Sequence, residues 1–90
     1  MRFWDTVEKV ATVAGRAIIL NQQVDDLMEM GEAAGMAHLG AWVPQLIEND
    51  GVDYVIRDLR NRETDERPDY RRKAKTFRVH TEVLVAGHSF

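Results

Sequence analysis

The stretch from residue 3 to residue 28 most constrains the fold, because only there does the spacing of apolar residues keep a helical period over many turns. Read in sevens, this apolar stripe has two main columns, which are Phe3, Val10, Ala17 and Val24, and Thr6, Val13, Leu20 and Leu27. The stripe predicts one long amphipathic helix or two collinear ones. Since an isolated helix cannot bury such a stripe, it must pack on other helices of the chain, on a second copy or on a partner.

Two more segments show helical spacing. Apolar residues recur at three and four positions through Met36, Leu39, Val43, Leu46 and Ile47, which predicts a second helix that folds back on the first as a helical hairpin. Pro44 predicts a kink or a restart inside that helix, and the two glycines of the 31–35 segment favour a turn before it. After a turn at residues 49–51, Val52, Val55, Ile56 and Leu59 predict a third short helix that ends near Arg62.

The last part of the chain has a different period. From residue 76 to residue 85 apolar and polar residues alternate, which predicts a C-terminal β-strand in a fold that is otherwise mainly α. A single strand needs a partner, so one alternative is an α+β fold with a β-hairpin formed by residues 52–59 and 76–85. The other alternative is an all-α fold, because the same part of the chain also contains a helical face. That face consists of Tyr70, Ala74, Phe77, Thr81 and Leu84, and Gly87 could end the helix.

Ninety residues predict a single small domain over residues 1–90, with a helical body (3–62), a charged linker (63–69) and a basic tail (70–90). A chain of this size buries only about 60 to 65% of its unfolded surface, so the core is thin. The absence of cysteine excludes a disulfide framework and thiolate metal sites. No start resembling a signal peptide and no sufficiently long apolar run are present, so we expect a cytoplasmic protein without membrane contact.

The net charge of −3 hides an asymmetry along the chain. Residues 1–56 hold three basic and nine acidic groups, whereas residues 57–78 hold nine basic and five acidic ones. The basic part is densest in a segment free of acids that consists of Tyr70, Arg71, Arg72, Lys73, Lys75 and Arg78, with Phe77 as a second aromatic. Clustered cations beside aromatic rings are typical of nucleic-acid contacts, although they can equally bind an acidic helix of a partner subunit.

Two acidic pairs are the main candidates for metal chemistry. Glu29 and Glu32, followed by Asp50 and Asp53, resemble the two acidic pairs of all-helical nucleotide pyrophosphatases. This resemblance covers two short patterns and implies Mg²⁺-dependent nucleotide hydrolysis as a further alternative function. Helix capping and a solvated helix face also explain these residues, and the three histidines lack the spacing of metal ligands, so we expect no metal and no cofactor.

These observations together favour a non-enzymatic protein-interaction or regulatory module that binds a partner protein, as a homodimer. The absence of a credible catalytic set supports this interpretation, and oligomerisation is one way for a thin core to gain stability. The residues expected to make the contact belong to the stripe and its flank, and they are Val10, Val13, Ala17, Leu20, Val24, Leu27 and Met28.

Overall fold

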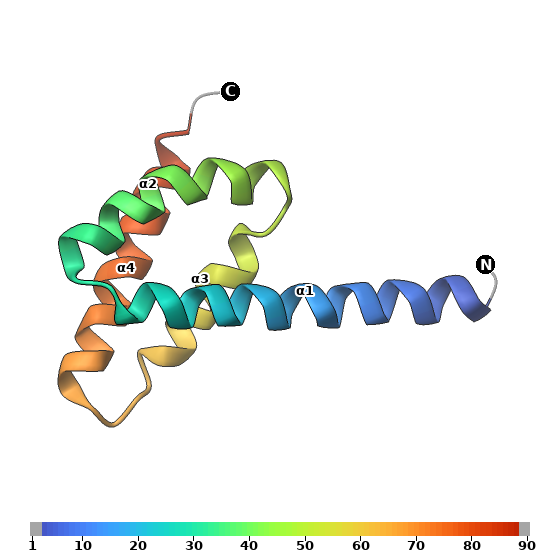
Figure 1. Cartoon of the computed structure of the whole chain (residues 1–90), viewed down its shortest axis with the longest axis horizontal. Coiled ribbons are helices and arrows are strands. Elements are labelled where there is room, and N and C mark those ends of the chain that lie inside the picture. Colours follow the sequence, from blue (N-terminus) through green and yellow to red (C-terminus); the bar gives the residue numbers. More distant parts are fainter. Residues whose placement is uncertain (1–2, 89–90) are drawn as a thin grey trace.

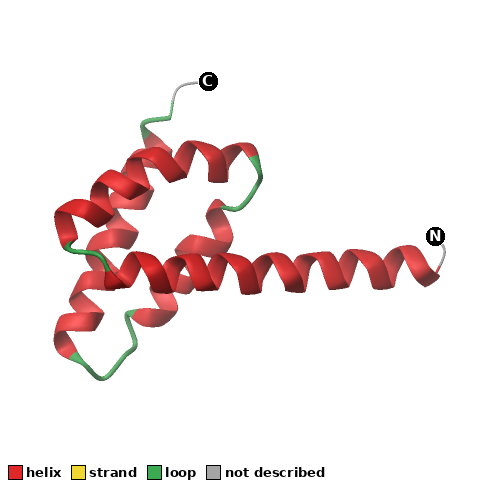
Figure 2. Ribbon diagram, in the orientation of Figure 1, coloured by secondary structure: helices red, strands yellow, loops and turns green. Residues whose placement is uncertain are grey.

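The structure is a computed structural model that describes the backbone of residues 3–88 and the side chains of residues 14–88. Within that range the chain is helical and contains no strand (Figures 1 and 2). The helices are α1 (Phe3–Glu29), α2 (Glu32–Glu48), α3 (Val52–Arg62) and α4 (Pro68–Ala86). The mainly α prediction is therefore confirmed in its all-α form.

The long N-terminal helix is present as expected, and its C-terminal part joins the other helices. α1 has 27 residues, which corresponds to about 40 Å of helix. In Figure 1 it extends well beyond the body formed by α2, α3 and α4. α1 packs chiefly against α3, while α2, which follows α1 across a short turn, packs chiefly against α4. The two halves of the body meet through α3 and α4.

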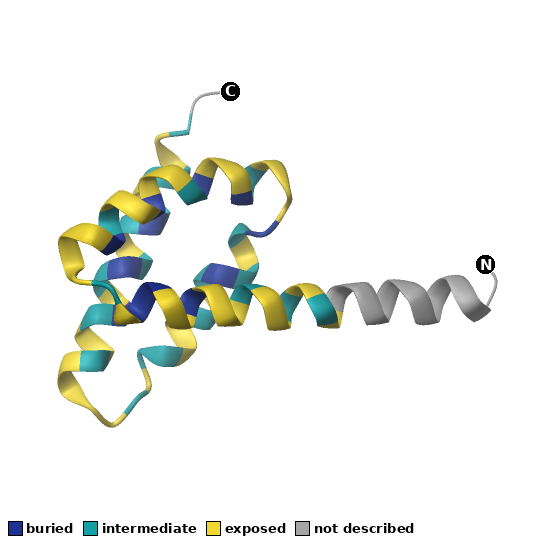
Figure 3. Cartoon of the chain, in the orientation of Figure 1, coloured by how far each residue is buried: buried dark blue, intermediate teal, exposed yellow. Residues whose placement is uncertain are grey.

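The core lies where these helices converge (Figure 3). Each helix sends apolar side chains into it, and the buried apolar residues are Val24, Leu27 and Met28 from α1, Leu39, Val43 and Leu46 from α2, Val55 and Leu59 from α3, and Ala74 and Phe77 from α4. Phe77 is the largest fully buried side chain. Residues of the predicted basic tail therefore contribute to the same core as the helical body.

The predicted C-terminal strand is wrong, because residues 76–85 lie within α4. The face that α4 turns to the core contains Ala74, Phe77 and Thr81, which recur at helical spacing. Thr81 is the buried polar residue of this face, and its hydroxyl donates a hydrogen bond of 2.7 Å to the Phe77 carbonyl one turn earlier. The β-hairpin of residues 52–59 and 76–85 is likewise excluded, since both segments are helical.

The second helix is present after a short turn, as predicted, but it packs chiefly against α4 and makes few contacts with α1, so the predicted packing of a helical hairpin is not the main one. Its start and its course past Pro44 also differ from the prediction. α2 begins at Glu32, so Gly35 lies inside the helix and packs against the ring of Phe77. Pro44 does not divide α2, which runs without interruption to Glu48. Pro44 has no amide hydrogen to donate to the carbonyl of Gly40, four residues earlier. Both residues are exposed, so the Gly40 carbonyl can bond to water instead.

The predicted turn at residues 49–51 is present, and Asp50 adopts the left-handed backbone conformation with φ of 56°. The predicted linker is shorter than expected, because α4 already begins at Pro68, a favourable first residue for a helix. Ion pairs form within residues 63–69 and between them and α4: Asp65 with Arg67, Glu63 with Arg78, and Asp69 with Arg72. Among the described residues, no helix has both the length and the apolar character needed to cross a membrane.

Candidate functional site

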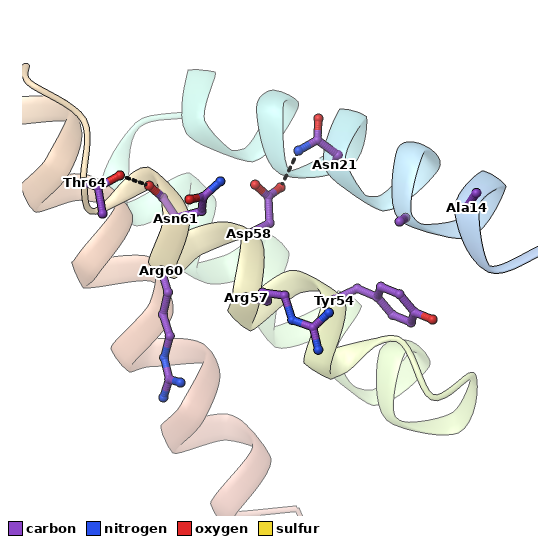
Figure 4. Close-up of a pocket in the computed structure, with 9 residues that line it drawn as sticks. Ala14, Asn21, Tyr54, Arg57, Asp58, Arg60, Asn61 and Thr64 are labelled. Carbon is purple, nitrogen blue, oxygen red and sulfur yellow. Dashed lines mark hydrogen bonds between the residues drawn. The ribbon is translucent and has the colours of Figure 1, made fainter. Parts of the chain in front are cut away.

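An open groove lies between α1 and α3, and we call it the α1–α3 groove (Figure 4). It has a volume of about 770 Å³. Its lining consists of Ala14, Ala17 and Asn21 from α1, Tyr54, Arg57, Asp58, Arg60 and Asn61 from α3, and Thr64 from the following loop. The α1 wall has small side chains at Ala14 and Ala17, while the α3 wall is polar and partly aromatic.

Polar contacts close the groove at the end nearest the core. The Asn21 amide donates a hydrogen bond of 3.0 Å to the Asp58 carboxylate, and Figure 4 shows the two side chains pointing toward one another. Arg62, one turn after Asp58, donates to the same carboxylate from Nε at 3.1 Å. These contacts fix the distance between α1 and α3 at this end of the groove.

Arg62 connects three helices and is largely buried, with 12% of its side chain exposed. Besides Asp58, it pairs with Asp25 of α1 at 2.7 Å and donates to the Tyr70 hydroxyl of α4 at 2.6 Å. Burial opposes the charged form of Arg62, but hydrogen bonds to Asp58, Asp25 and Tyr70 outweigh that cost and raise its pKa. The guanidinium therefore stays charged and holds α1, α3 and α4 together.

The residues predicted to bind a partner fall into three groups. Val24, Leu27 and Met28 are buried in the core of the chain itself, so they do not form an exposed surface. Ala17 and Leu20 are half-buried, with Ala17 in the α1–α3 groove and Leu20 packed against the core. The side chains of Val10 and Val13 lie outside the described residues.

The predicted basic segment is helical, and part of it serves the fold. Tyr70 is half-buried with the Arg67 guanidinium 4.2 Å from its ring centre, and Phe77 is fully buried. Arg78 pairs with Glu63 at 2.6 Å and with Glu82 at 3.1 Å. Both carboxylates, Glu63 first, raise the pKa of Arg78 against the effect of burial. Neither aromatic ring is therefore free to stack on a base.

The remaining cations of that segment face solvent more openly. Arg71, Arg72 and Lys75 are exposed, and together with Glu63 and Pro68 they line a shallow hollow of about 460 Å³. Arg72 pairs with Asp69 one turn earlier, and Lys73 is half-buried with its ammonium 6.0 Å from the centre of the Phe77 ring. Arg71, Arg72 and Lys75 are thus the part of the segment that an anionic partner can reach.

The two acidic pairs do not come together. Glu29 and Glu32 flank the turn between α1 and α2, whereas Asp50 and Asp53 lie at the turn between α2 and α3. No group of three or more His, Cys, Asp or Glu side chains capable of holding a metal ion exists among the residues with described side chains. The arrangement implied by the resemblance to nucleotide pyrophosphatases is not formed.

Sequence reasoning missed the α3 wall of the groove and the Arg62 network. Asp58 and Arg62 are spaced as an ion pair on a helix, which is visible in the sequence, but their bonds to Asn21 and Asp25 depend on how α1 crosses α3. Asn21 interrupts an apolar stripe, and such an interruption is a signal of a specific polar contact. No comparable signal marks Tyr54 or Arg57.

Within the described residues the chain is a small all-α protein with an open groove between two helices and without a cluster of His, Cys, Asp or Glu side chains that could hold a metal ion. No protein-family model matches the chain, and the comparisons with curated proteins and with solved structures give no match.

Proposed function

We propose that this chain is a non-enzymatic protein-interaction or regulatory module that receives a helix of a partner protein in the α1–α3 groove and acts as a homodimer in the cytoplasm. The observation that carries the proposal is the groove itself. α1 and α3 are in contact through the Arg62 network near the core, and beyond Asn21 the space between them is not filled by any described part of the chain.

The lining of the groove suits a helix. Ala14 and Ala17 lie one turn apart on α1 and carry only methyl groups, so another helix can approach closely. Tyr54 offers an aromatic ring with a polar end on the opposite wall, which is a common anchor at protein interfaces. An amphipathic helix of about three turns would therefore find apolar and aromatic contacts along the groove.

The charge of the groove indicates the flanking residues of that partner helix. Arg57 lines the groove, is exposed and forms no ion pair with any described residue. Arg60, whose side chain is 64% exposed, lies on the same helix and pairs only at its tip with Glu82 at 3.2 Å. We therefore expect the partner helix to carry acidic side chains beside its apolar stripe, since charge complementarity increases both the rate and the specificity of association.

Ala17→Arg is the variant that tests this proposal, because the long charged side chain would fill the groove without touching the fully buried core. Wild-type and variant proteins first serve as baits in a native lysate. Any protein that is retained is then purified, and calorimetry measures the direct binding of its helical segment to the wild type and to the variant. We expect an acidic amphipathic helix that binds the wild type and binds the variant at least ~10-fold more weakly.

Ala37→Arg is the matched control, since Ala37 is exposed on α2 away from the groove. It should leave binding unchanged, and circular dichroism should show both variants folded. A partner that binds wild type and Ala17→Arg equally, or one that lacks an acidic amphipathic helix, would refute the groove as the binding site.

Nucleic-acid binding stays a second candidate because Arg71, Arg72 and Lys75 are exposed on one part of α4. Its stacking component lacks support, since Tyr70 and Phe77 are directed into the fold. If the protein binds nucleic acid through these cations, it should bind a labelled single-stranded RNA at low salt and lose affinity steeply as salt rises. A variant with the three cations neutralised together should not bind the RNA. An absence of binding at low salt would eliminate this candidate.

A further inference from the structure

The solvent face of α4 combines cations and exposed valines. Arg72, Lys75, Val79 and Val83 recur at three and four residues and therefore lie along one side of the helix, opposite the core residues. Val79 is 44% exposed and Val83 is 62% exposed. This α4 outer face borders a hollow of about 360 Å³ that also contains Met36 of α2. The face is cationic at its N-terminal end and apolar at its C-terminal end.

The outer side of α1 has the opposite distribution. Ile18, Gln22, Asp26 and Glu29 recur at four, four and three residues, and all of them are exposed. Ile18 is 60% exposed, and its neighbour Ile19 is 58% exposed. Asp26 and Glu29 form no hydrogen bond or ion pair with any described residue. This α1 outer face is therefore apolar at its N-terminal end and acidic at its C-terminal end.

We propose that the α1 outer face of one copy packs antiparallel on the α4 outer face of a second copy. In that register the four pairs across the contact are Ile18 with Val83, Gln22 with Val79, Asp26 with Lys75, and Glu29 with Arg72. From N- to C-terminus the spacing is four, four and three residues on α1 and three, four and four residues on α4. When the helices are antiparallel the two spacings coincide, so all the pairs stay aligned over about 16 Å of helix.

The alternative directions of packing do not produce this match. A parallel arrangement would place Ile18 beside Arg72 and Glu29 beside Val83, which desolvates charges against apolar groups. Antiparallel packing of either face on itself would juxtapose cations with valines or acids with isoleucines. The second copy is therefore the occupant that the charges and apolar groups on both faces favour.

This contact deepens the self-association part of the proposed function and does not depend on a ligand in the α1–α3 groove. Ala17, which lines the groove, and Ile18 point to different sides of α1, as their different exposure indicates. Each copy carries one α1 face and one α4 face. If a two-fold axis relates the copies, the contact is made twice in a closed dimer, whereas without that axis it extends head to tail, and the mass of the assembled species distinguishes the two.

Charge reversal provides the test, because Asp26 and Lys75 are both exposed and their replacement leaves the core intact. Sedimentation velocity across a concentration series should show that wild type self-associates and that Asp26→Lys or Lys75→Glu each weaken the association at least ~10-fold. The double variant Asp26→Lys/Lys75→Glu restores the attraction with reversed signs and should recover most of the wild-type association. Glu48→Lys, at an exposed position on α2, is the control and should change nothing.

A strictly monomeric wild type would overturn the contact, as would a double variant no better than the single ones. If the wild type is monomeric and a labelled single-stranded RNA binds it but not Lys75→Glu, the α4 outer face is a polyanion site and the contact between copies is wrong. These results are separable from those of the groove: loss of partner binding by Ala17→Arg tests the groove, and the charge swap tests the contact between copies.

Discussion

Gly35 illustrates how a single residue sets the packing of α2 on α4. A Cβ atom at this position would lie 2.7 Å from Cε1 of Phe77, closer than such atoms approach in real proteins. Phe77 is fully buried among core side chains and cannot move aside easily. We expect Gly35→Ala to destabilise the protein by about 1 to 2 kcal/mol, because overpacking outweighs the gain in helix propensity.

Gly40 provides the matched control within the same helix. It is exposed, and a methyl group at this position would have no neighbouring atom within 4 Å, so Gly40→Ala should stabilise the protein by about 0.5 to 1 kcal/mol. Urea unfolding of both variants measures whether each substitution lowers or raises the free energy of unfolding. A Gly35→Ala protein as stable as Gly40→Ala would mean that α2 and α4 do not approach each other as closely as the structure indicates.

At the scale of the elements, Arg62 is the residue that couples α1 to α3 and α4. Its removal in Arg62→Met leaves Asp58, whose side chain is only 14% exposed, without its main partner. We expect the free energy of unfolding to fall by about 1.5 to 3 kcal/mol, the range for losing charge-assisted hydrogen bonds. Hydrogen exchange should show the amides around Val24 and Leu27 losing protection most.

Arg57→Met is the corresponding control, because Arg57 is exposed on the same helix and has no ion pair among the described residues. Its effect on stability should stay within about 0.5 kcal/mol. Uniform loss of protection in all helices of the Arg62→Met protein would contradict a coupling role specific to α1.

The sequence was sufficient for the helices whose apolar residues all enter the core. α3 matches its predicted range because Val55 and Leu59 are buried at helical spacing and few apolar residues lie elsewhere on it. The strand prediction for residues 76–85 is wrong because Val79 and Val83 lie on the solvent face of α4. With Phe77 and Val85 they create a period of two that competes with the helical face. Exposed valines thus explain the error and also mark the α4 outer face.

Other features depend on how the helices cross and could not be read from spacing. The stripe of α1 correctly predicted a long helix, but periodicity does not reveal that Val24, Leu27 and Met28 are covered by the chain itself. The α1–α3 groove requires the crossing of two helices far apart in sequence, and of its lining with described side chains only Ala17 was among the predicted contact residues. Long-range geometry, and not local preference, decides both points.

Over the described part of the molecule, several cations of the basic segment are neutralised by carboxylates from the acidic body, from the segment itself and from the end of α4. Arg62 pairs with Asp25 of α1, and Arg78 pairs with Glu63 and Glu82. Ion pairing also lowers the pKa of some of the carboxylates. Arg78 is the main cause of a lowered pKa of Glu82, and the Arg67 side chain and amide lower the pKa of Asp65 to about 2 from its ordinary 3.8.

Acid should therefore weaken the fold through these carboxylates. A group whose pKa is lowered by folding stabilises the folded state fully above its unfolded pKa and loses that contribution as pH falls through its folded pKa. For Asp65 and Glu82 the loss begins below about pH 4.5 and, for Asp65, is complete only below about pH 2. We expect the midpoint of urea unfolding to be nearly constant from neutral pH to about pH 5 and to decrease below it.

The variant Arg78→Gln shows whether the ion pairs cause that decrease. At neutral pH it should unfold at a lower urea concentration than wild type, because Glu63 and Glu82 lose their shared partner. Arg78 lowers the pKa of Glu82 in the wild type, so the contribution of this pair is lost as pH falls through that lowered pKa, and the two midpoints should approach each other in acid. Arg57→Gln, which removes an exposed cation without an ion pair in the described region, should follow wild type throughout. A difference between Arg78→Gln and wild type that stays constant down to pH 2 would assign the role of Arg78 to packing of its aliphatic stem and not to its charge.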